Sequence, residues 1–309
     1  MVKVESMKKI TVVGSINMDY VLNVPHMPQT GETLLAQNFA MLPGGKGANQ
    51  AYAAGKLEGA VTMLGAVGDD GAGRVLCESL RSAGVDVSRI QPVKEEATGS
   101  AFICVDPAGS NHIVVAQGAN RAMDIAYLQE NDDVLKASDI VVLQLEIPLE
   151  TVLYAAKRAK ELGKLVILDP APARSDIPDD LYPCIDYLKP NEGEAALLAG
   201  VPEGDPVKAA NLLRAKGVKN VLVTLGAEGA LLLDETGAVK KFPGLTGLTV
   251  VDTTAAGDCF TAALACRLAA EESPEQAVSF AGKASGLSVT RAGAQPSLPT
   301  LREVLDWKG

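Results

Sequence analysis

Short apolar, β-prone runs alternate with longer helical patterns through most of this 309-residue chain. From residue 120 onward the alternation is regular, with strands predicted at residues 140–145, 165–168, 185–188 and 221–224. Two long helices are expected at residues 260–270 and 274–290. Strands that alternate with helices imply a mostly parallel sheet with right-handed crossovers. The predicted fold class is therefore α/β, a three-layer sandwich whose central, mostly parallel β-sheet is flanked by helices.

One part of the chain departs from this alternation and predicts a second, smaller sheet. Residues 98–105 and 112–117 are β-prone, and the sequence Asp-Pro-Ala-Gly-Ser-Asn at 106–111 joins them, which is a hairpin signal. A hairpin is out of place between strand–helix–strand units. Residues 20–43 are also irregular, and their part at 33–42 can be extended. We expect these two regions to form a small β-sheet apart from the main one.

The composition excludes several functional classes. The net charge is −10 and no basic patch stands out, which argues against nucleic acid as a partner. No apolar run is long enough to span a bilayer, and the N-terminus lacks the apolar core of a signal peptide, so a cytoplasmic protein is expected. The five cysteines include no C-x-x-C pair, which makes a disulfide framework or a zinc site improbable. The chain has only two histidines, far apart in sequence, so base chemistry falls to carboxylates.

The sequence Asp-Thr-Thr-Ala-Ala-Gly-Asp at 252–258 leads into the first of the two long predicted helices. Its small residues leave the N–H groups of a helix start free to face an anion, and the helix dipole favours that anion. Asp258 would repel a phosphate there unless it takes a proton from a nucleophile that attacks phosphorus. The alternative is that Asp258 only stabilises the first helical turn. This stretch by itself supports both interpretations equally.

Polar side chains follow several predicted strands at the point where each strand ends. In an open parallel sheet, ligands bind in the crevice outside the carboxyl ends of the strands. One crevice can therefore collect all of these groups, and their convergence is the strongest functional argument from the residues alone. The groups are Asn17, Asp19, Glu146, Asp169, Asn191, Glu194, Thr224 and Gly226.

The sequence Gly-Gly-Lys-Gly-Ala-Asn at 44–49 resembles a phosphate loop but fails the Walker pattern, because Gly47 follows the lysine where Ser or Thr is required. Its glycines admit a ligand close to the backbone, and Lys46 and Asn49 supply donors. A polyhydroxyl ligand is favoured here over a plain helix-start turn.

The remaining strand-end groups have structural alternatives that the residues leave open. Taken alone, Asn17-x-Asp19 is better explained as a turn or helix cap, although Asp19 can accept two hydrogen bonds from a vicinal diol. Glu146 is either a satisfied edge carboxylate or an acceptor for a sugar hydroxyl. Asn191-x-x-Glu194 fits a helix cap, while the functional interpretation places Glu194 near a metal-bound triphosphate.

Over nearly its full length the sequence resembles the ribokinase-type sugar kinases. The two signature regions of that family correspond to residues 44–49 and 252–258. Between them, in the family's order and approximate spacing, stand Asn17-Met18-Asp19, Leu145-Glu146, Pro190 to Glu194 and Thr224-Leu225-Gly226.

The resemblance implies ATP-dependent phosphorylation of D-ribose at its 5-hydroxyl, with Asp258 as the base. The backbone N–H groups of Ala255, Ala256 and Gly257 would form the anion hole. By the same resemblance the sugar would be held by Asn17, Asp19, Gly45, Lys46, Asn49, Glu146 and Asp258. The nucleotide side would be lined by Asn191, Thr224, Gly226, Gly257 and Gly282, with Glu194 near Mg²⁺.

The resemblance also implies a monovalent cation, K⁺, beside the anion hole, and a β-sheet lid that pairs two subunits. The cation positions are Asp252, Thr254, Ser288, Arg291, Gly293 and Ser297, mostly through backbone carbonyls. Residues 1–17, 44–96 and 118–309 would form the kinase domain, and residues 18–43 and 97–117 the discontinuous lid and homodimer contact.

Ala227 and Gly282 stand where related kinases often carry polar residues, which predicts weaker or mainly apolar adenine contacts. The alternatives are a kinase of 2-deoxyribose, another sugar or a nucleoside, and a sugar sensor without catalysis. Asp19 favours a sugar with a vicinal diol, whereas no apolar pocket for a nucleobase can be identified. A sensor should have lost the base or the anion hole, and both are present in the sequence.

Overall fold

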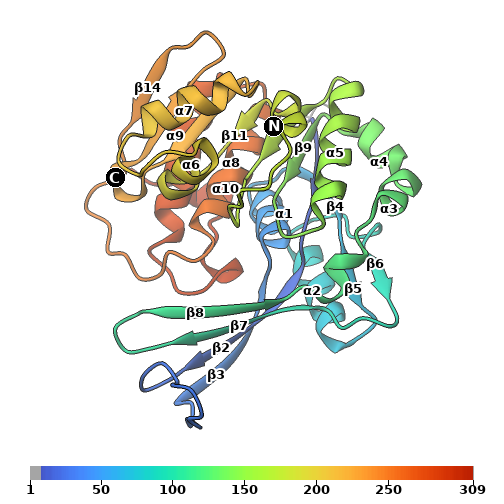
Figure 1. The fold of residues 1–309 in the computed structure, drawn as a ribbon, viewed down its shortest axis with the longest axis vertical. Helices are drawn as coiled ribbons and strands as arrows, with labels where there is room; N and C mark the ends of the chain where they lie inside the picture. Colours follow the sequence, from blue (N-terminus) through green and yellow to red (C-terminus); the bar gives the residue numbers. More distant parts are fainter. Residues whose placement is uncertain (1–7, 309) are drawn as a thin grey trace.

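The computed structural model describes residues 8–308. Its main sheet has eight strands in the order β14-β13-β12-β11-β10-β9-β1-β4 (Figure 1). The six neighbouring strands β4, β1, β9, β10, β11 and β12 are parallel to one another, while β13 and β14 add an antiparallel edge. These strands are β1 (Lys9–Val13), β4 (Ala60–Leu64), β9 (Ile140–Leu143), β10 (Leu165–Leu168), β11 (Tyr187–Leu188), β12 (Asn220–Thr224), β13 (Ala230–Leu233) and β14 (Val239–Phe242).

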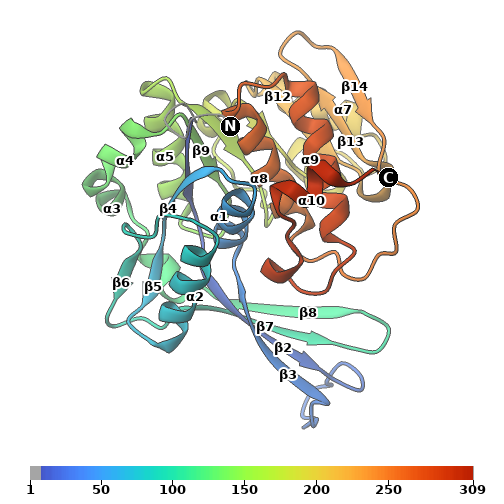
Figure 2. The same ribbon diagram turned by 180° about the vertical axis from the view of Figure 1, so that it is seen from behind.

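Helices cover both faces of this sheet and enclose two separate hydrophobic cores (Figures 1 and 2). Because successive side chains of a strand point to opposite faces, Val12 lies in one core and Val13 in the other. One face carries α1 (Lys46–Lys56), α2 (Gly71–Ser82), α8 (Ala256–Ala269), α9 (Pro274–Ser288) and α10 (Leu301–Asp306). The other carries α3 (Ile125–Glu130), α4 (Asp132–Ala137), α5 (Leu149–Glu161), α6 (Glu192–Ala199) and α7 (Pro206–Ala215). The predicted three-layer α/β class is confirmed.

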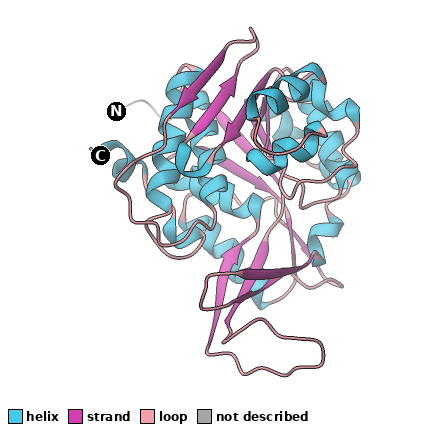
Figure 3. Cartoon of the chain, turned by 60° about the vertical axis from the view of Figure 1, so that its left-hand side comes forward, coloured by secondary structure: helices cyan, strands magenta, loops and turns pink. Residues whose placement is uncertain are grey.

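A four-stranded sheet projects from the main body, as Figure 3 shows. Its order is β3-β2-β7-β8, formed by β2 (Asn17–Asn23), β3 (Asn38–Gly44), β7 (Gly99–Val105) and β8 (Asn111–Ala116). The small separate sheet predicted from the hairpin is therefore confirmed. The boundaries proposed for two domains stay a prediction, and residues 1–7 of the larger one lie outside the described residues.

Two details of this region differ from the sequence interpretation. Asn17 and Asp19 lie in neither a turn nor a helix cap but open strand β2, which pairs with β3 on one side and with β7 on the other. The ladders to two neighbours override the weak strand preference of Asn and Asp. A further two-stranded parallel sheet, β5 (Ala66–Gly68) with β6 (Gln91–Val93), carried no distinct signal in the sequence.

The helices that carry the signature sequences begin within those sequences. Helix α1 begins at Lys46, inside the glycine-rich sequence at 44–49, and α8 begins at Ala256 rather than at the predicted residue 260. As a result Lys46 and Asp258 both lie in the first turn of a helix. Within residues 8–308, no helix combines the length and apolar composition needed to cross a membrane.

Candidate active site

Asp258 lies in the first turn of α8 and is buried, with 5% of its surface exposed. Both carboxylate oxygens accept hydrogen bonds from helix α1. Asn49 Nδ2 donates to Oδ2 at 3.1 Å, and Gln50 Nε2 donates to Oδ1 at 2.9 Å. Burial raises the pKa of Asp258 to about 6, against the opposing charge of Lys46. A carboxylate with such a pKa is ionised at neutral pH and can still accept a proton.

The N-terminus of α8 has the geometry expected of an anion site. Ala255 caps the helix in the left-handed region, with φ 61° and ψ 9°, and Gly257 is exposed. The first N–H groups of a helix have no acceptor within the helix, so they can serve a bound anion. One of the three predicted donors is engaged here, because the N–H of Ala256 donates to the carbonyl of Thr253 at 3.2 Å.

The turn before α1 is built around two glycines. A Cβ on Gly44 would lie 2.0 Å from Oδ2 of Asp19, and a Cβ on Gly45 would lie 2.7 Å from the backbone nitrogen of Asn17. Gly45 also has φ 86°, which favours glycine. Side chains on β2 can therefore approach the start of α1 only because both positions lack a Cβ.

Glu146, just beyond β9, closes the same turn from the main sheet. Its Oε2 accepts a hydrogen bond from the backbone N–H of Lys46 at 3.1 Å and another from Ser15 Oγ at 2.5 Å. Ser15 Oγ in turn accepts the N–H of Gly47 at 3.3 Å. Glu146 is thus a satisfied carboxylate in this structure, and it is also half-buried beside Lys46.

The charged groups of the site shift one another's pKa values. Burial, together with the charges of Glu146 and Asp258, raises the pKa of Asp19 to about 7. Burial opposes the charge of Lys46, but the surrounding carboxylates of Asp258, Asp169, Glu146 and Glu194 outweigh it and raise the pKa of Lys46. The crevice therefore holds the ammonium group of Lys46 among several carboxylates.

Asn17 joins the site through a residue that the sequence did not single out. Its Oδ1 accepts a hydrogen bond from Asn120 Nδ2 at 2.7 Å, and Asn120 Oδ1 accepts the N–H of Ile16 at 2.9 Å. Asn120 is buried in a short 3-10 helix, where nothing in the local sequence distinguishes it from a capping residue.

On the predicted nucleotide side, the capping interpretation of Asn191 and Glu194 is realised. Glu194 N donates to Asn191 Oδ1, and Asn191 N donates to Glu194 Oε2, both at 2.8 Å. Asn191 also pairs with Thr224 across an isolated bridge between the ends of β11 and β12. Gly226 follows Thr224, exposed and with φ 57°. Gly282 lies in α9, where an added Cβ would meet only Phe260, at 4.0 Å.

The residues predicted to hold a monovalent cation come from the loop before α8 and from the segment that runs from the end of α9 to the 3-10 helix Gln295–Ser297. Asp252 Oδ1 accepts hydrogen bonds from Thr254 N at 2.9 Å and Thr254 Oγ1 at 2.6 Å, and Oδ2 accepts one from Gly293 N at 2.8 Å. Burial works against it, but these hydrogen bonds hold the pKa of Asp252 below its usual value. The Ser288 and Ser297 hydroxyls donate to the nearby carbonyls of Ser285 and Ala294. The Arg291 side chain turns away and pairs with Glu303 at 2.6 Å.

Within the part of the chain that the structure describes, no three His, Cys, Asp or Glu side chains lie close enough together to hold a metal ion. In phosphoryl-transfer sites, Mg²⁺ is usually bound by one or two carboxylates together with substrate phosphates and water.

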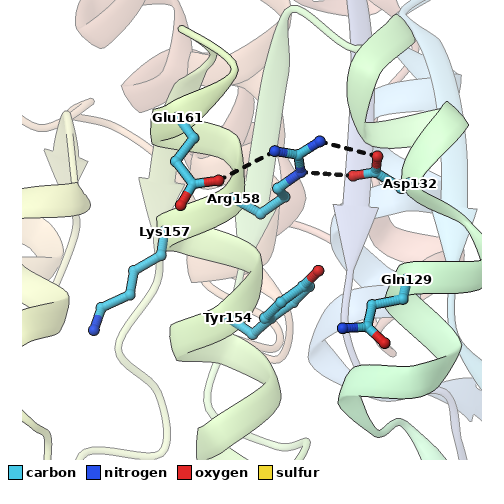
Figure 4. Close-up of a pocket in the computed structure, with 6 residues that line it drawn as sticks. All are labelled: Gln129, Asp132, Tyr154, Lys157, Arg158 and Glu161. Carbon is cyan, nitrogen blue, oxygen red and sulfur yellow. Dashed lines mark hydrogen bonds and ion pairs between the residues drawn. The ribbon is translucent and has the colours of Figure 1, made fainter.

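Two surface hollows lie apart from the groups described so far. The one in Figure 4 has a volume of about 380 Å³ and lies between α3, α4 and α5. Arg158 in it is paired with Asp132, through Nε at 2.7 Å, and with Glu161 at 3.1 Å, so its charge is already neutralised. The other hollow, of about 550 Å³, is lined by Gln117, Leu145, Pro172, Ala173, Arg174, Ser175, Asp176 and Leu197. Neither contains a predicted site residue.

The structure also brings together buried polar residues behind Asp258 that the sequence did not assign. Gln50 links Asp258 to Asp169, while Lys189 Nζ lies 3.0 Å from Asp169 Oδ2 and donates to the carbonyl of Gly257 at 3.2 Å. Asp169 was noted only as a strand-end group. Lys189 directly follows the predicted strand at 185–188, and this position is the one sequence signal that points to a role for Lys189 in the site.

Comparison with known proteins agrees with this arrangement of fold and site. The family described as pfkB family carbohydrate kinase matches residues 7–301 of the chain. This chain therefore belongs to the pfkB family of carbohydrate kinases and is a sugar kinase.

Within that class, the similarity is to ribokinases. A ribokinase from Haemophilus influenzae is 40% identical over 303 residues, which cover 97% of this chain and 98% of that protein. The crystal structure of a ribokinase from Thermotoga maritima has 41% identity and a TM-score of 0.89, and covers 96% of this chain and 98% of that one. The structure of Arabidopsis thaliana ribokinase complexed with ribose and ATP has 35% identity and a TM-score of 0.92, with 97% and 98% covered.

Proposed function

We propose that this chain transfers the γ-phosphoryl group of ATP to the 5-hydroxyl of D-ribose, giving ADP and D-ribose 5-phosphate. The observation that carries the proposal is the position of Asp258, a buried carboxylate at the N-terminus of a long helix, within hydrogen-bond distance of Asn49. The similarity to a ribokinase that binds ribose and ATP supports this choice of substrates.

In the reaction, the sugar hydroxyl oxygen forms a bond to the γ-phosphorus as the bond between that phosphorus and the ADP oxygen breaks. Asp258 takes the hydroxyl proton. The N–H groups of Ala255 and Gly257, the N–H of Ala256 once it leaves the carbonyl of Thr253, and the dipole of α8 stabilise the charge on the transferring group. Phosphoryl transfer depends mainly on positioning and on charge stabilisation, and a base held at a helix N-terminus combines the two.

The sugar lies, in this proposal, between the start of α1 and strand β2. Asp19 accepts hydrogen bonds from two adjacent hydroxyls of the sugar. Glu146, Lys46 and Asn49 contact its other hydroxyls. Gly45 lets the backbone of Asn17 lie against the start of α1 beside the sugar, and the side chain of Asn17 is held in place by Asn120. An ionised Asp19 is a good acceptor for a vicinal diol, which favours ribose over 2-deoxyribose.

The nucleotide lies beyond α8, along Asn191, Thr224 and Gly226, with Gly282 leaving space on α9. The Asn191–Glu194 cap fixes the Glu194 carboxylate, and its charge interacts with that of Lys46. Glu194 is therefore suited to hold Mg²⁺ through water. The ion would neutralise charge on the triphosphate.

We further propose that K⁺ binds between the loop at 252–254 and the loop that contains Gly293, where Asp252 supplies the negative charge. Backbone carbonyls near Thr254, Ser288, Arg291, Gly293 and Ser297 would complete the site. The cation would hold the chain that leads into the anion hole. Turnover is expected to rise when K⁺ replaces Na⁺ at constant ionic strength, and equal rates in both salts would remove this assignment.

The four-stranded sheet is proposed to serve as a lid over the sugar and as the contact between two subunits. In the β ladders, Met41, Phe102 and Val114 share the face of Tyr20, opposite to that of Asp19. Tyr20 stacks on Phe39 and Phe102, yet Phe39, Met41, Phe102 and Val114 remain 47–68% exposed. Such an apolar patch favours association with a second copy. The same lid would exclude water from the reaction.

All five cysteines are free thiols, which fits a reducing compartment such as the cytoplasm.

The identity of the phosphoryl acceptor is tested by an ATP-consumption screen over ribose, 2-deoxyribose, fructose, ribulose and adenosine. The proposal expects ribose to give the highest kcat/KM. A preference for adenosine or 2-deoxyribose would move the chain to another acceptor, and binding of sugar without any ATP consumption would make it a sensor.

A further inference from the structure

Gln50 occupies an unusual position for an uncharged amide, because it is fully buried between two carboxylates. Its Nε2 donates to Asp258 Oδ1 at 2.9 Å and to Asp169 Oδ2 at 3.0 Å. Its Oε1 accepts a hydrogen bond from Gln144 Nε2 at 2.6 Å. Every polar group of the side chain is thus engaged, and the orientation of the amide is fixed from the side of Gln144.

Asp169 is itself held by a buried ion pair. Its Oδ2 lies 3.0 Å from Lys189 Nζ and accepts a hydrogen bond from Thr261 Oγ1 at 3.2 Å. The side chains of Asp169 and Lys189 are 2% and 4% exposed, so the pair is screened from water. A buried pair of this kind contributes little net stability, but it fixes the position of whatever hydrogen-bonds to it.

The same pair reaches the start of α8 directly. Lys189 Nζ donates to the carbonyl of Gly257 at 3.2 Å, and Thr261 Oγ1, whose single hydrogen is shared between Asp169 and this carbonyl, lies 3.0 Å from the carbonyl oxygen. The pair therefore holds both the backbone of the predicted anion hole and, through Gln50, the side chain of the predicted base. Leucine or methionine could fill the space of Gln50, but neither could bridge two carboxylates.

The two oxygens of Asp258 are divided between different partners. Gln50 binds Oδ1 from the interior, and Asn49, which is proposed to contact the sugar, lies at Oδ2. We propose that Gln50, anchored by the Asp169–Lys189 pair, is a positioning residue that holds Oδ1 of Asp258 and so turns Oδ2 toward the sugar hydroxyl. This inference rests on the proposed kinase function.

The inference is tested with Gln50→Met, which keeps the volume and removes the donors. The expected result is a kcat about 10- to 100-fold lower with the KM for ribose nearly unchanged, the range that losing an orienting partner costs in comparable sites. The charged groups that face Asp258 are Lys46, Asp169, Lys189 and Asp19. They remain in the variant, so losing the Gln50 hydrogen bond raises the pKa of the base and moves the acid limb of kcat to higher pH.

The effect of Gln50→Met in a second background, the Asp258→Asn variant, distinguishes a positioning role of Gln50 from a merely structural one. In Asp258→Asn, which has no base to position, Gln50→Met should lower the residual kcat by less than about twofold, since effects of residues that act as a unit are not additive. Thr11→Val is the matched control. It removes a buried hydrogen bond to Ser138 on another part of the sheet and should leave the pH profile of kcat unchanged.

If Gln50→Met does not fold, Gln144→Met provides the test. It removes the donor that orients the Gln50 amide, so it should move the acid limb of kcat in the same direction. An unshifted acid limb, or an equal loss of kcat with and without the Asp258 carboxylate, would overturn the inference while leaving the kinase function intact. A wild-type protein with no ribose-kinase activity would overturn both.

Discussion

Asp258 combines deep burial with a place at the positive end of a helix dipole. At the scale of single residues, this combination accounts for its proposed role. Burial makes the carboxylate basic enough to accept a proton, and Lys46 and the helix terminus keep it ionised near neutral pH.

The first prediction removes the base. Asp258→Asn keeps the shape of the side chain but not its charge, and kcat should fall by about 10²- to 10⁴-fold, the usual contribution of a general base. Binding of ribose, measured by calorimetry, should be largely kept. A turnover within about threefold of the wild type would contradict the assignment of the base.

The same variant has a stability readout that checks its fold. Burial raises the pKa of Asp258 from its ordinary value of 3.8 to about 6, so folding loses stability as the pH rises through that window and the buried charge forms. At pH 8 the neutral asparagine removes this cost, but its NH2 group faces one of the two amide donors of α1, so Tm should stay within about 5 °C of the wild type. A Tm below the temperature of the assay would mean that the variant had lost activity through unfolding.

The second prediction concerns pH. Asp258, with a pKa of about 6, must be ionised to take a proton, and Asp19, with a pKa of about 7, must be ionised to accept the sugar hydroxyls. The kcat/KM for ribose should therefore be constant above about pH 8 and should fall through pH 7 to 6. A profile that is flat down to pH 5 would exclude both carboxylates from the rate-determining steps.

At the scale of elements, the carboxyl ends of β1, β9, β10, β11 and β12 bring the polar groups to one edge of the sheet, and α1 and α8 add the residues of their first turns. This convergence was predictable because parallel strands end on the same side. Asp19 and Glu146 lie near each other, as their place after strands led us to expect, and Asp258, which the family resemblance adds to the site, lies near both.

The residues behind the site were not predictable in the same way. Gln50 and Gln144 are isolated amides within a helix and at a strand end, and only the three-dimensional packing shows that they meet. Strand β2 was missed because its Asn and Asp residues have weak strand preference, and pairing on both sides overrides that preference. Single-residue signals carry little information about distant partners, and Gln144 lies 94 positions from Gln50.

The third prediction tests the turn before α1. In Gly44→Ala the new Cβ would lie 2.0 Å from Oδ2 of Asp19, so Asp19 must move. A displaced contact of this kind should lower kcat/KM for ribose by about 10- to 100-fold. The matched control is Gly71→Ala, where nothing lies within 4 Å of the new Cβ and the kinetics should not change. Unaltered kinetics in Gly44→Ala would argue against Asp19 as a sugar ligand.

At the scale of the whole molecule, an α/β body carries a small sheet whose two faces differ. The face with Asp19 includes a residue of the site, and the face with Tyr20 presents the exposed aromatic side chains of Phe39 and Phe102. Closure over the sugar and association between copies would therefore use opposite faces of one sheet.

The fourth prediction concerns that association. The wild-type protein should have a mass in solution of about twice the 32.0 kDa of the chain. Val114→Lys, at a site that is 68% exposed on β8, should yield the monomer, because a buried unpaired charge is costly at an interface. Leu305→Lys, at a site that is 60% exposed on α10, is the control and should leave the mass unchanged. A monomeric wild type would contradict the proposed contact.

The measurement that tests the central claim most directly is identification of the product by proton-coupled ³¹P NMR after incubation of the protein with ATP, Mg²⁺, K⁺ and D-ribose. Transfer to the 5-hydroxyl predicts a new phosphate ester signal split into a triplet by the two protons on C5. This signal should grow in step with ADP, and with Asp258→Asn it should grow at least about 100-fold more slowly. A doublet from an ester on C1, or ADP formed with inorganic phosphate and no ester, would contradict the account.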